Sequence, residues 1–498
     1  GASWITSHVL AVDQDQVLIL ALELAQEEMS AFGHVLIVGA GIFGASTALE
    51  LARLGHRVTI VDRSQDGYAC ENASSHDLNK IVRSDYMDAH YRDLGKKAIE
   101  LWRSHPLYAP YFHEVGIFFY SGVPASNEEP WLRNGVENAI KPIQGAYEFG
   151  KHTERPMART IKSPLEAMHV FPERLRPHLG EALTSFDKQV GYLNPQAGWV
   201  EARNATFAVL DEAKRLGVEV VSDASIVELV FASSSSSSSS TQAKPRVCGA
   251  VTSNGRTIHA DRVVLAAGCW TPSLLETLHV PLKKPILRPS AHCVLTLKIQ
   301  PDVARLFHGS PVTFNMDTGM YTFEPNPDGI LKCAIHGLGS SSPDPRDSTT
   351  PAFPHANTNP HVSQMLKHIQ AMFPVLQMDG PNKNMDVYYT RFCWYCDTAD
   401  ENFLIDFHPD VDNLLVASGD SGHALKFLPL MGRLITSKLL HIENDSALAP
   451  DMGLSAYQRR VFSFEHHMHA DKTVNTSMPI DYIRIGSTPP AHVPQPKL

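Results

Sequence analysis

A glycine-rich turn constrains the fold of this chain more than any other feature. Gly39, Gly41 and Gly44 lie between an apolar run at 35–38 and a stretch with helical apolar spacing at 45–54. Gly39 permits a tight turn, Gly41 lets the backbone approach a pyrophosphate, and Gly44 allows the helix to pack closely on the strand. Because a helix N-terminus presents free N–H groups, the sequence predicts a strand–turn–helix unit that binds the phosphates of a dinucleotide.

A carboxylate at the end of the next predicted strand supports this interpretation. The run 58–61 predicts a second buried strand, and Asp62 follows it directly, 21 residues after Gly41. An acidic side chain at this position binds a ribose hydroxyl of the dinucleotide. The glycines alone are a weak signal, but the two flanking strands and the acid make it strong. The unit does not by itself distinguish NAD from FAD.

The chain beyond this unit indicates a flavoprotein. An NAD-dependent dehydrogenase usually continues with three more strand–helix pairs. This chain continues with an insertion, a helix–strand pair, an antiparallel meander and one more buried strand. That interrupted order is typical of two-domain flavoproteins, so an NAD-dependent dehydrogenase is the remoter alternative. The predicted elements are a helix at 202–216 and strands at 218–221, 226–231, 247–252, 257–260 and 262–268.

We therefore predict an α/β fold (an α+β two-domain flavoprotein). A Rossmann-like FAD-binding domain carries an inserted substrate domain with an antiparallel sheet. The inserted segments are richer in proline, aromatic residues and histidine, and they lack the strand–helix alternation. We assign 29–118, 187–285 and 387–450 to the FAD-binding domain, 119–186 and 286–386 to the substrate domain, 451–498 to a C-terminal tail and 1–28 to a leader or extension.

The composition excludes several classes of partner. The 498 residues carry 43 Lys+Arg and 53 Asp+Glu, so the net charge of −10 argues against a dedicated nucleic-acid-binding protein. No apolar run reaches the ~18–20 residues that span a membrane. Seven scattered cysteines favour a reducing compartment over a disulfide framework. The 25 histidines lack metal-ligand spacing, so we expect no metal site, and we expect a monomer whose partners are small molecules.

Four further segments carry motifs that indicate the same class. The loop 74–83 has two basic residues three apart, and 329–336 contains Lys-Cys-Ala-Ile-His. The segment 393–406 begins Cys-Trp-Tyr-Cys-Asp-Thr, and 419–429 is a second glycine-rich turn. With the dinucleotide unit, in this order and spacing, they resemble the D-amino-acid-oxidase superfamily of flavoproteins over about residues 33–440. More narrowly, the chain resembles the fungal type of the monomeric sarcosine oxidase and fructosyl amino acid oxidase (amadoriase) branch.

The resemblance implies roles for the charged side chains of these segments. Lys80 is expected to face the flavin ring, and Arg83 and Lys426 are expected to bind the carboxylate of the substrate. Lys332 is expected to promote the reaction with O2, and His336 to line the substrate site. Lys80 stands where sarcosine oxidases have an arginine, and it agrees in type with the amadoriases. The catalytic candidates are therefore Lys332, Lys80 and His336.

The resemblance also implies a covalent bond between the flavin and a cysteine. Cys393 matches the family position by its spacing to Thr398, and Cys396 is the local competitor. Cys393 lies just before a predicted strand, and Arg391 would share its face in an extended segment and favour the thiolate. A turn at 394–395 would instead favour Cys396. We expect the bond at Cys393.

The expected function is that of an FAD-dependent oxidase, which converts the C–N bond of a secondary-amine amino acid to an imine and reduces O2 to H2O2. Candidate substrates are N-methyl amino acids, fructosyl amino acids, saccharopine and pipecolate. The alternative is an amine oxidase of fungal secondary metabolism, whose imine product drives a C–C ring closure. The residues expected to bind FAD are Gly39, Gly41, Phe43, Gly44, Asp62, Arg63, Ser74, Ser75, His76, Lys80, Ile226, Gly268, Cys393, Asp420, Gly422, His423 and Lys426.

The last residues of the chain suggest a cellular address. The sequence ends Pro496-Lys497-Leu498, which is similar to the Ser-Lys-Leu signal for peroxisomes. Pro496 replaces the usual small residue and weakens the signal. Because an H2O2 producer benefits from a compartment rich in catalase, we expect the protein in peroxisomes, and in the cytoplasm otherwise.

Overall fold

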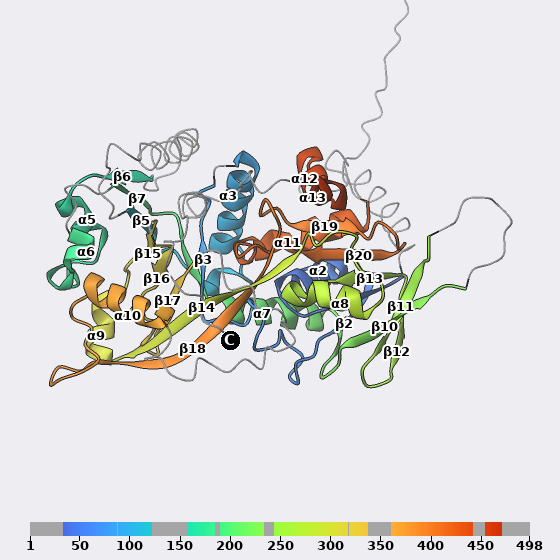
Figure 1. Cartoon of the computed structure of the whole chain (residues 1–498), viewed down its shortest axis with the longest axis horizontal. Helices are drawn as coiled ribbons and strands as arrows, with labels where there is room; N and C mark the ends of the chain where they lie inside the picture. Colours follow the sequence, from blue (N-terminus) through green and yellow to red (C-terminus); the bar gives the residue numbers. More distant parts are fainter. Residues whose placement is uncertain are drawn as a thin grey trace, which may run out of the picture.

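The structure is a computed structural model that describes residues 33–86, 88–121, 158–184, 190–233, 244–316, 318–336, 360–441 and 454–470. The predicted leader at 1–28, the end of the chain at 496–498 and most of the serine run at 233–240 lie outside these residues. Within the described ranges, no helix combines the length and the apolarity that a membrane span requires. Two large sheets dominate the molecule, and helices cover both (Figure 1).

The smaller of these sheets contains the predicted dinucleotide unit. Its six strands have the order β19-β20-β13-β1-β2-β9, and all neighbouring pairs are parallel except β19 with β20. The predicted strands at 35–38, 58–61 and 262–268 all belong to it, although the last ends earlier because a 3-10 turn follows. The strands are β1 (His34–Val38), β2 (Arg57–Val61), β9 (Glu219–Val221), β13 (Arg262–Leu265), β19 (Leu404–Phe407) and β20 (Leu414–Ser418).

Helix α2 (Ile42–Arg53) lies at the centre of the helical layer over this sheet. It packs against α11 (Leu428–Leu439) and α7 (Ala202–Arg215). A Cβ at Gly432 of α11 would lie 2.1 Å from the carbonyl oxygen of Ser46, so the two helices approach at a glycine. The other helices of this half are α3 (Ala89–Ser104), η2 (Ala109–Tyr111), η4 (Gly268–Trp270), α8 (Thr271–Thr277), η6 (Leu425–Phe427), α12 (Ala456–Val461) and α13 (Phe464–His469).

Two small sheets extend this half. One is the antiparallel sheet β10-β11-β12, which confirms the predicted pairing of 226–231 with 247–252. The other has the order β3-β8-β4 and places Lys80 opposite Val200. The strands are β3 (Lys80–Val82), β4 (Phe112–His113), β8 (Gly198–Val200), β10 (Ile226–Phe231), β11 (Val247–Thr252) and β12 (Thr257–His259).

The larger sheet has eight strands in the order β18-β14-β17-β16-β15-β5-β7-β6. Only β15 with β5 is parallel, so the sheet is mostly antiparallel, as expected for the second part of the chain. Its strands are β5 (Ile117–Ser121), β6 (Arg159–Ile161), β7 (Val190–Asn194), β14 (Arg288–Ile299), β15 (Val312–Asn315), β16 (Met320–Thr322), β17 (Ile330–Ile335) and β18 (Met385–Asp397). The helices packed beside it are α5 (Pro164–Val170), η3 (Arg176–His178), α6 (Glu181–Thr184), α9 (Pro301–Phe307) and α10 (Pro360–Met372).

Strands β14 and β18 connect the two halves of the molecule. They pair along their whole lengths, from Arg288 opposite Asp397 to Ile299 opposite Met385, and they run between the two halves (Figure 1). Our assignment placed residues from 387 onward in the FAD-binding domain, but those of β18 lie in the larger sheet because β14 supplies their hydrogen-bonding partners. Strand β7 differs from the assignment in the same way. The residues before Asp397 therefore lie at the boundary between the two large sheets.

Gly44 provides a test of the packing at the first turn. A Cβ at Gly44 would lie 1.9 Å from the carbonyl oxygen of Gly39, so Gly44→Ala forces α2 away from β1. We expect urea unfolding to show a loss of about 3 kcal/mol or more in the free energy of unfolding. Gly217→Ala is the control, because this glycine has a φ of +96° and no atom within 4 Å of the added Cβ. The control should lose only about 1–2 kcal/mol, and equal losses would contradict the packing argument.

Candidate functional site

The turn between β1 and α2 forms one wall of a cavity of about 320 Å³, here called the dinucleotide cavity. Gly39 has a φ of +104°, and a Cβ there would lie 2.5 Å from the carbonyl oxygen of Ala266. Asp62 accepts a hydrogen bond from the N–H of Ala40 at 2.8 Å. Burial raises the pKa of Asp62, although backbone N–H donors oppose this effect. The turn therefore holds a carboxylate beside the N-terminus of α2.

The dinucleotide cavity fits the ADP half of a cofactor. Gly41 caps α2 without a side-chain hydrogen bond, and the N–H of Ile42 donates to Ser75 Oγ at 3.2 Å. The remaining N–H groups of the first turn suit phosphate oxygens. Gly41 and Asp62 both line the cavity. The structure brings these residues together at one wall because all of them belong to one local strand–turn–helix–strand unit.

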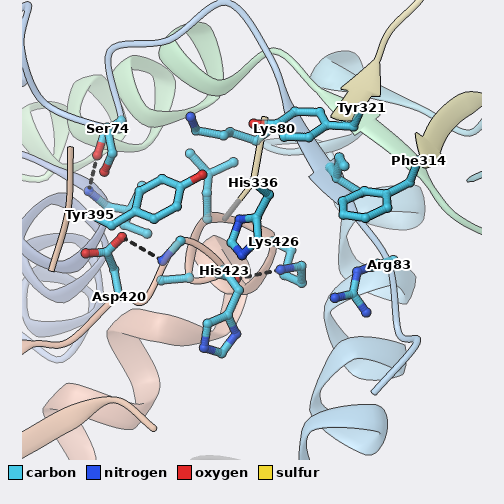
Figure 2. Close-up of a pocket in the computed structure, with 16 residues that line it drawn as sticks. Ser74, Lys80, Arg83, Phe314, Tyr321, His336, Tyr395, Asp420, His423 and Lys426 are labelled. Atoms are coloured by element: carbon cyan, nitrogen blue, oxygen red, sulfur yellow. Dashed lines mark hydrogen bonds between the residues drawn. The ribbon is translucent and has the colours of Figure 1, made fainter. Parts of the chain in front are cut away.

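A second cavity, of about 70 Å³, adjoins the first and is here called the ring cavity. Ile42, Ser74, Ser75 and Asp420 line both cavities, so one elongated molecule would pass between them. Figure 2 shows Arg83, Lys426 and Phe314 toward one end of the ring cavity, and Ser74 and Asp420 toward the other. FAD has the shape that this arrangement fits, with its ADP in the first cavity and its flavin toward the second.

Most of the residues predicted to bind the cofactor line one of the two cavities, but three do not. Gly44 acts through helix packing, and Cys393 lies behind the wall of the ring cavity, where it contacts Lys80. His76 lies outside both cavities: its Nδ1 is 2.9 Å from the carbonyl oxygen of Ala69, and it lines a separate hollow with Arg391. The predicted residues that line a cavity are Gly39, Gly41, Phe43, Asp62, Arg63, Ser74, Ser75, Lys80, Ile226, Gly268, Asp420, Gly422, His423 and Lys426.

Arg83 and Lys426 are two buried cations that line the same end of the ring cavity. Lys426 donates a hydrogen bond to the carbonyl oxygen of His423 at 2.8 Å. Burial and the nearby charge of Arg83 hold the pKa of Lys426 well below its ordinary value. Arg83 donates to the carbonyl oxygen of Asp85, whose carboxylate accepts two hydrogen bonds from Asn194 at 2.9 and 3.1 Å. An anionic group entering here would relieve the repulsion between the two cations.

Asp77 was absent from the sequence prediction, yet it connects two of the catalytic candidates. Its Oδ2 accepts hydrogen bonds from Lys80 and, at 2.7 Å, from Lys332. Lys332 is completely buried in β17 and also donates to the carbonyl oxygen of Asn79 at 2.6 Å. The carboxylate three residues before Lys80 was the available signal, but the sequence could not show that Lys332 joins it.

The two candidate cysteines lie on opposite faces of β18. Residues 394–395 form no turn, and Cys393 lies inside β18, which continues as a strand to Asp397. Cys393 packs in the cluster that contains Tyr395, whereas Cys396 packs in the cluster that contains Trp394. Burial and the charge of Asp420 raise the pKa of Cys396 to about 12. This environment disfavours the thiolate of Cys396.

A lysine, rather than an arginine, faces the sulfur of Cys393. Lys80 Nζ lies 3.0 Å from Cys393 Sγ. Arg391, which we expected to favour the thiolate, instead donates to the carbonyl oxygens of His76 and Ala73. The prediction considered only neighbours along the strand, whereas the loop before β3 brings Lys80 across from a distant part of the chain.

The second glycine-rich turn closes the ring cavity against Tyr395. Asp420 accepts hydrogen bonds from the N–H of Cys396 at 2.7 Å and of Gly422 at 3.3 Å, and burial raises its pKa to about 7. A Cβ at Gly422 would lie 2.3 Å from the ring of Tyr395, so the close approach requires glycine. His423 lines the cavity, but its ring nitrogens lie 2.9 Å from the hydroxyl of Tyr86 and from a backbone carbonyl oxygen.

Aromatic side chains of the larger sheet, which sequence reasoning missed, form the remaining walls. Tyr321 and Phe314 line the cavity from adjacent strands, and their rings are parallel with centroids 6.0 Å apart. His336 lines it as predicted. His292 stacks on Tyr395 at 3.9 Å from the side of β14. Aromatic residues in strands are common in any core, so no sequence signal separated these from the rest.

Comparisons with known proteins agree with this geometry. Residues 34–438 match the model of the DAO family, described as FAD dependent oxidoreductase. The chain is 28% identical over 420 residues to an L-saccharopine oxidase of Schizosaccharomyces pombe, covering 82% of this chain and 89% of that protein. It is 24% identical to a peroxisomal sarcosine oxidase of Homo sapiens, covering 83% and 94%.

Among solved structures, a fructosamine oxidase (Amadoriase II) of Aspergillus fumigatus matches with a TM-score of 0.63. It is 26% identical, and the match covers 85% of this chain and 89% of that one. The family match spans both large sheets and every cavity-lining residue discussed above. The chain belongs to the DAO family of FAD-dependent oxidoreductases.

Proposed function

We propose that this protein is an FAD-dependent oxidase of the C–N bond of a secondary-amine amino acid, and that it produces an imine and H2O2. The observation that carries the proposal is the pair of buried cations, Arg83 and Lys426, at the far end of the ring cavity from Asp420. The relatives named above act on saccharopine, sarcosine and fructosamine, which supports the substrate class.

The residues of the ring cavity bind and orient the substrate. Arg83 and Lys426 hold the α-carboxylate, which places the amine at a fixed distance from them toward the centre of the cavity. The carboxylate also stabilises the charged form of Lys426, whose pKa is lowered by burial and by Arg83. Tyr395 and Tyr321 exclude water from the reacting bond.

FAD, when bound, accepts two electrons from the amine and passes them to O2. Gly39, Gly41 and Asp62 would hold its ADP half, and the segment around Gly422 would approach its ring system. Lys332 is the buried cation that stabilises negative charge as O2 is reduced, while Lys80 faces Cys393, the proposed point of covalent attachment.

A second candidate function is an amine oxidation in fungal secondary metabolism, in which the imine product drives a C–C ring closure. The aromatic lining favours it: Phe314, Tyr321 and Tyr395 offer flat apolar faces to an N-methylated aromatic amino acid. Both functions share the same oxidative step. They differ in whether the imine cyclises or is hydrolysed by water.

A panel of amines tests the function and the carboxylate-binding pair together. The purified enzyme should oxidise at least one secondary-amine amino acid and release one H2O2 per amine, with N-methyl aromatic amino acids, fructosyl-valine, saccharopine and pipecolate as candidates. Arg83→Ala or Lys426→Ala should lower kcat/KM for the amino acid. The decrease should correspond to a loss of about 2–5 kcal/mol in transition-state stabilisation. The matching decarboxylated amine is the control and should change much less. Equal losses for both substrates would assign the two cations to the fold instead.

Acid precipitation tests the covalent bond to Cys393. The wild-type precipitate should stay yellow, and Cys393→Ser should release its flavin into the supernatant because a hydroxyl does not form the thioether. Cys396→Ser is the matched control from the opposite face of β18 and should keep its flavin. Retention by Cys393→Ser together with loss by Cys396→Ser would move the bond to Cys396, and free FAD from the wild type would disprove it.

We also place the enzyme in peroxisomes. The human relative is described as peroxisomal, and an enzyme that releases H2O2 gains from nearby catalase. A fluorescent protein fused to the N-terminus, which leaves the C-terminus free, should co-localise with a peroxisomal marker in a fungal host. Deletion of residues 496–498 is the control and should make the signal diffuse. Diffuse fluorescence from the intact chain would contradict this location.

A further inference from the structure

Asp77 lies between the two lysines that the proposed oxidase uses. One carboxylate oxygen, Oδ2, accepts hydrogen bonds from Lys80 and Lys332. The side chains of Asp77 and Lys332 are 0% exposed, and that of Lys80 is 14% exposed. Water therefore screens the interactions among these three charges only weakly. One buried anion must balance two buried cations.

The surrounding groups determine how strongly each member of the trio holds its proton. Asp77 also feels the positive charge of Arg391, and Lys80 also faces Cys393 and the hydroxyl-bearing ring of Tyr321. Burial lowers the pKa of Lys332 to about 8, with Lys80 acting in the same direction and Asp77 against it. Asp77 is thus the main group that keeps Lys332 protonated near neutral pH.

The other two members of the trio respond differently. Burial alone would raise the pKa of Asp77, but the charges of Lys332, Lys80 and Arg391 hold it well below its usual range. Burial alone would lower the pKa of Lys80, but Asp77 and Cys393 raise it above its ordinary value. Lys332 is therefore the member that loses its proton first when the balance is disturbed.

We propose that Asp77 is a positioning residue for the oxygen reaction, because it holds Lys332 in place and protonated while Lys80 remains charged beside Cys393. The geometry supports this role in two ways. The shared Oδ2 fixes the Nζ of Lys332 together with the carbonyl oxygen of Asn79, and the same oxygen separates two ammonium groups that would otherwise repel. The proposal rests on the proposed oxidase function and deepens it.

A spectral titration of the resting holoenzyme tests the proposal without turnover. A cation near the ring cavity that loses its charge changes the electric field at a flavin bound there and shifts its absorption, so the wild type should titrate near pH 8. Lys332→Met should abolish this titration, which identifies the group. Asp77→Asn keeps the shape of the side chain but removes its charge, so the titration should move at least one pH unit lower.

The pH profile of flavin reoxidation by O2 provides the second measurement. Asp77→Asn should shift this profile downward by the same amount, which makes reoxidation at pH 8 slower by about fivefold or more, with recovery at lower pH. Anaerobic reduction by substrate should change much less. A residue with only a structural role would lower all rates without moving either profile.

Two further variants make the experiment decisive. Asp400→Asn is the matched control, because Asp400 is a buried carboxylate paired with His466 at 2.5 Å and it lines neither cavity. It should leave both profiles in place. Lys80→Met removes the competing cation and should move the Lys332 titration upward, which tests the repulsion that the shared oxygen of Asp77 is proposed to offset.

The outcomes separate this proposal from the proposed function. An unshifted titration in folded Asp77→Asn, or in Lys80→Met, overturns the proposed role of Asp77. It leaves the proposed oxidase function in place. A wild-type protein that binds FAD but oxidises no amine overturns the proposed function, and the role of Asp77 falls with it. Shifts in opposite directions for the two variants confirm that one carboxylate balances both lysines.

Discussion

The structure depends on the burial of positive charge at the boundary between two sheets. Lys332, Arg83 and Lys426 are each at most 5% exposed. Arg83 and Lys426 line the ring cavity, and Lys332 shares Asp77 with Lys80, which also lines it. Because a buried cation is costly without a partner, each is held by a carboxylate or a carbonyl oxygen. Asp77 is the most consequential of these partners, since it serves two lysines with one oxygen.

This burial determines what the larger sheet must provide. Strand β17 supplies Lys332, β18 supplies Cys393, and the loop before β3 supplies Asp77, so three distant segments meet behind the ring cavity. The long pairing of β14 with β18 gives that meeting point a rigid wall. Alternation along β18 then directs Cys393 and Tyr395 to the cavity side and Cys396 to the opposite core.

The smaller sheet and its helices form the rigid wall of the dinucleotide cavity. The contacts at Gly39, Gly44 and Gly432 let α2 lie close to both its strand and α11, which fixes the helix N-terminus beside Asp62. The same packing positions Asp420 and Gly422, because the segment that carries them leads directly into α11. One helix layer thus holds both Asp62 of the dinucleotide cavity and Asp420, which lines both cavities.

The sequence by itself determined the dinucleotide unit, because its strand, turn, helix and acid lie within 30 consecutive residues and follow local rules. The family resemblance added four candidate site residues, because the residue types at these positions match the family motifs: Lys80, Arg83, Lys332 and Lys426. Only the tertiary structure decided their partners. Asp77 is indistinguishable from a surface residue until β17 brings Lys332 to it across 255 positions. Cys393 and Cys396 point to opposite faces because β18 continues as a strand through both of them. Pairing across such distances depends on sheet register, which local patterns do not encode.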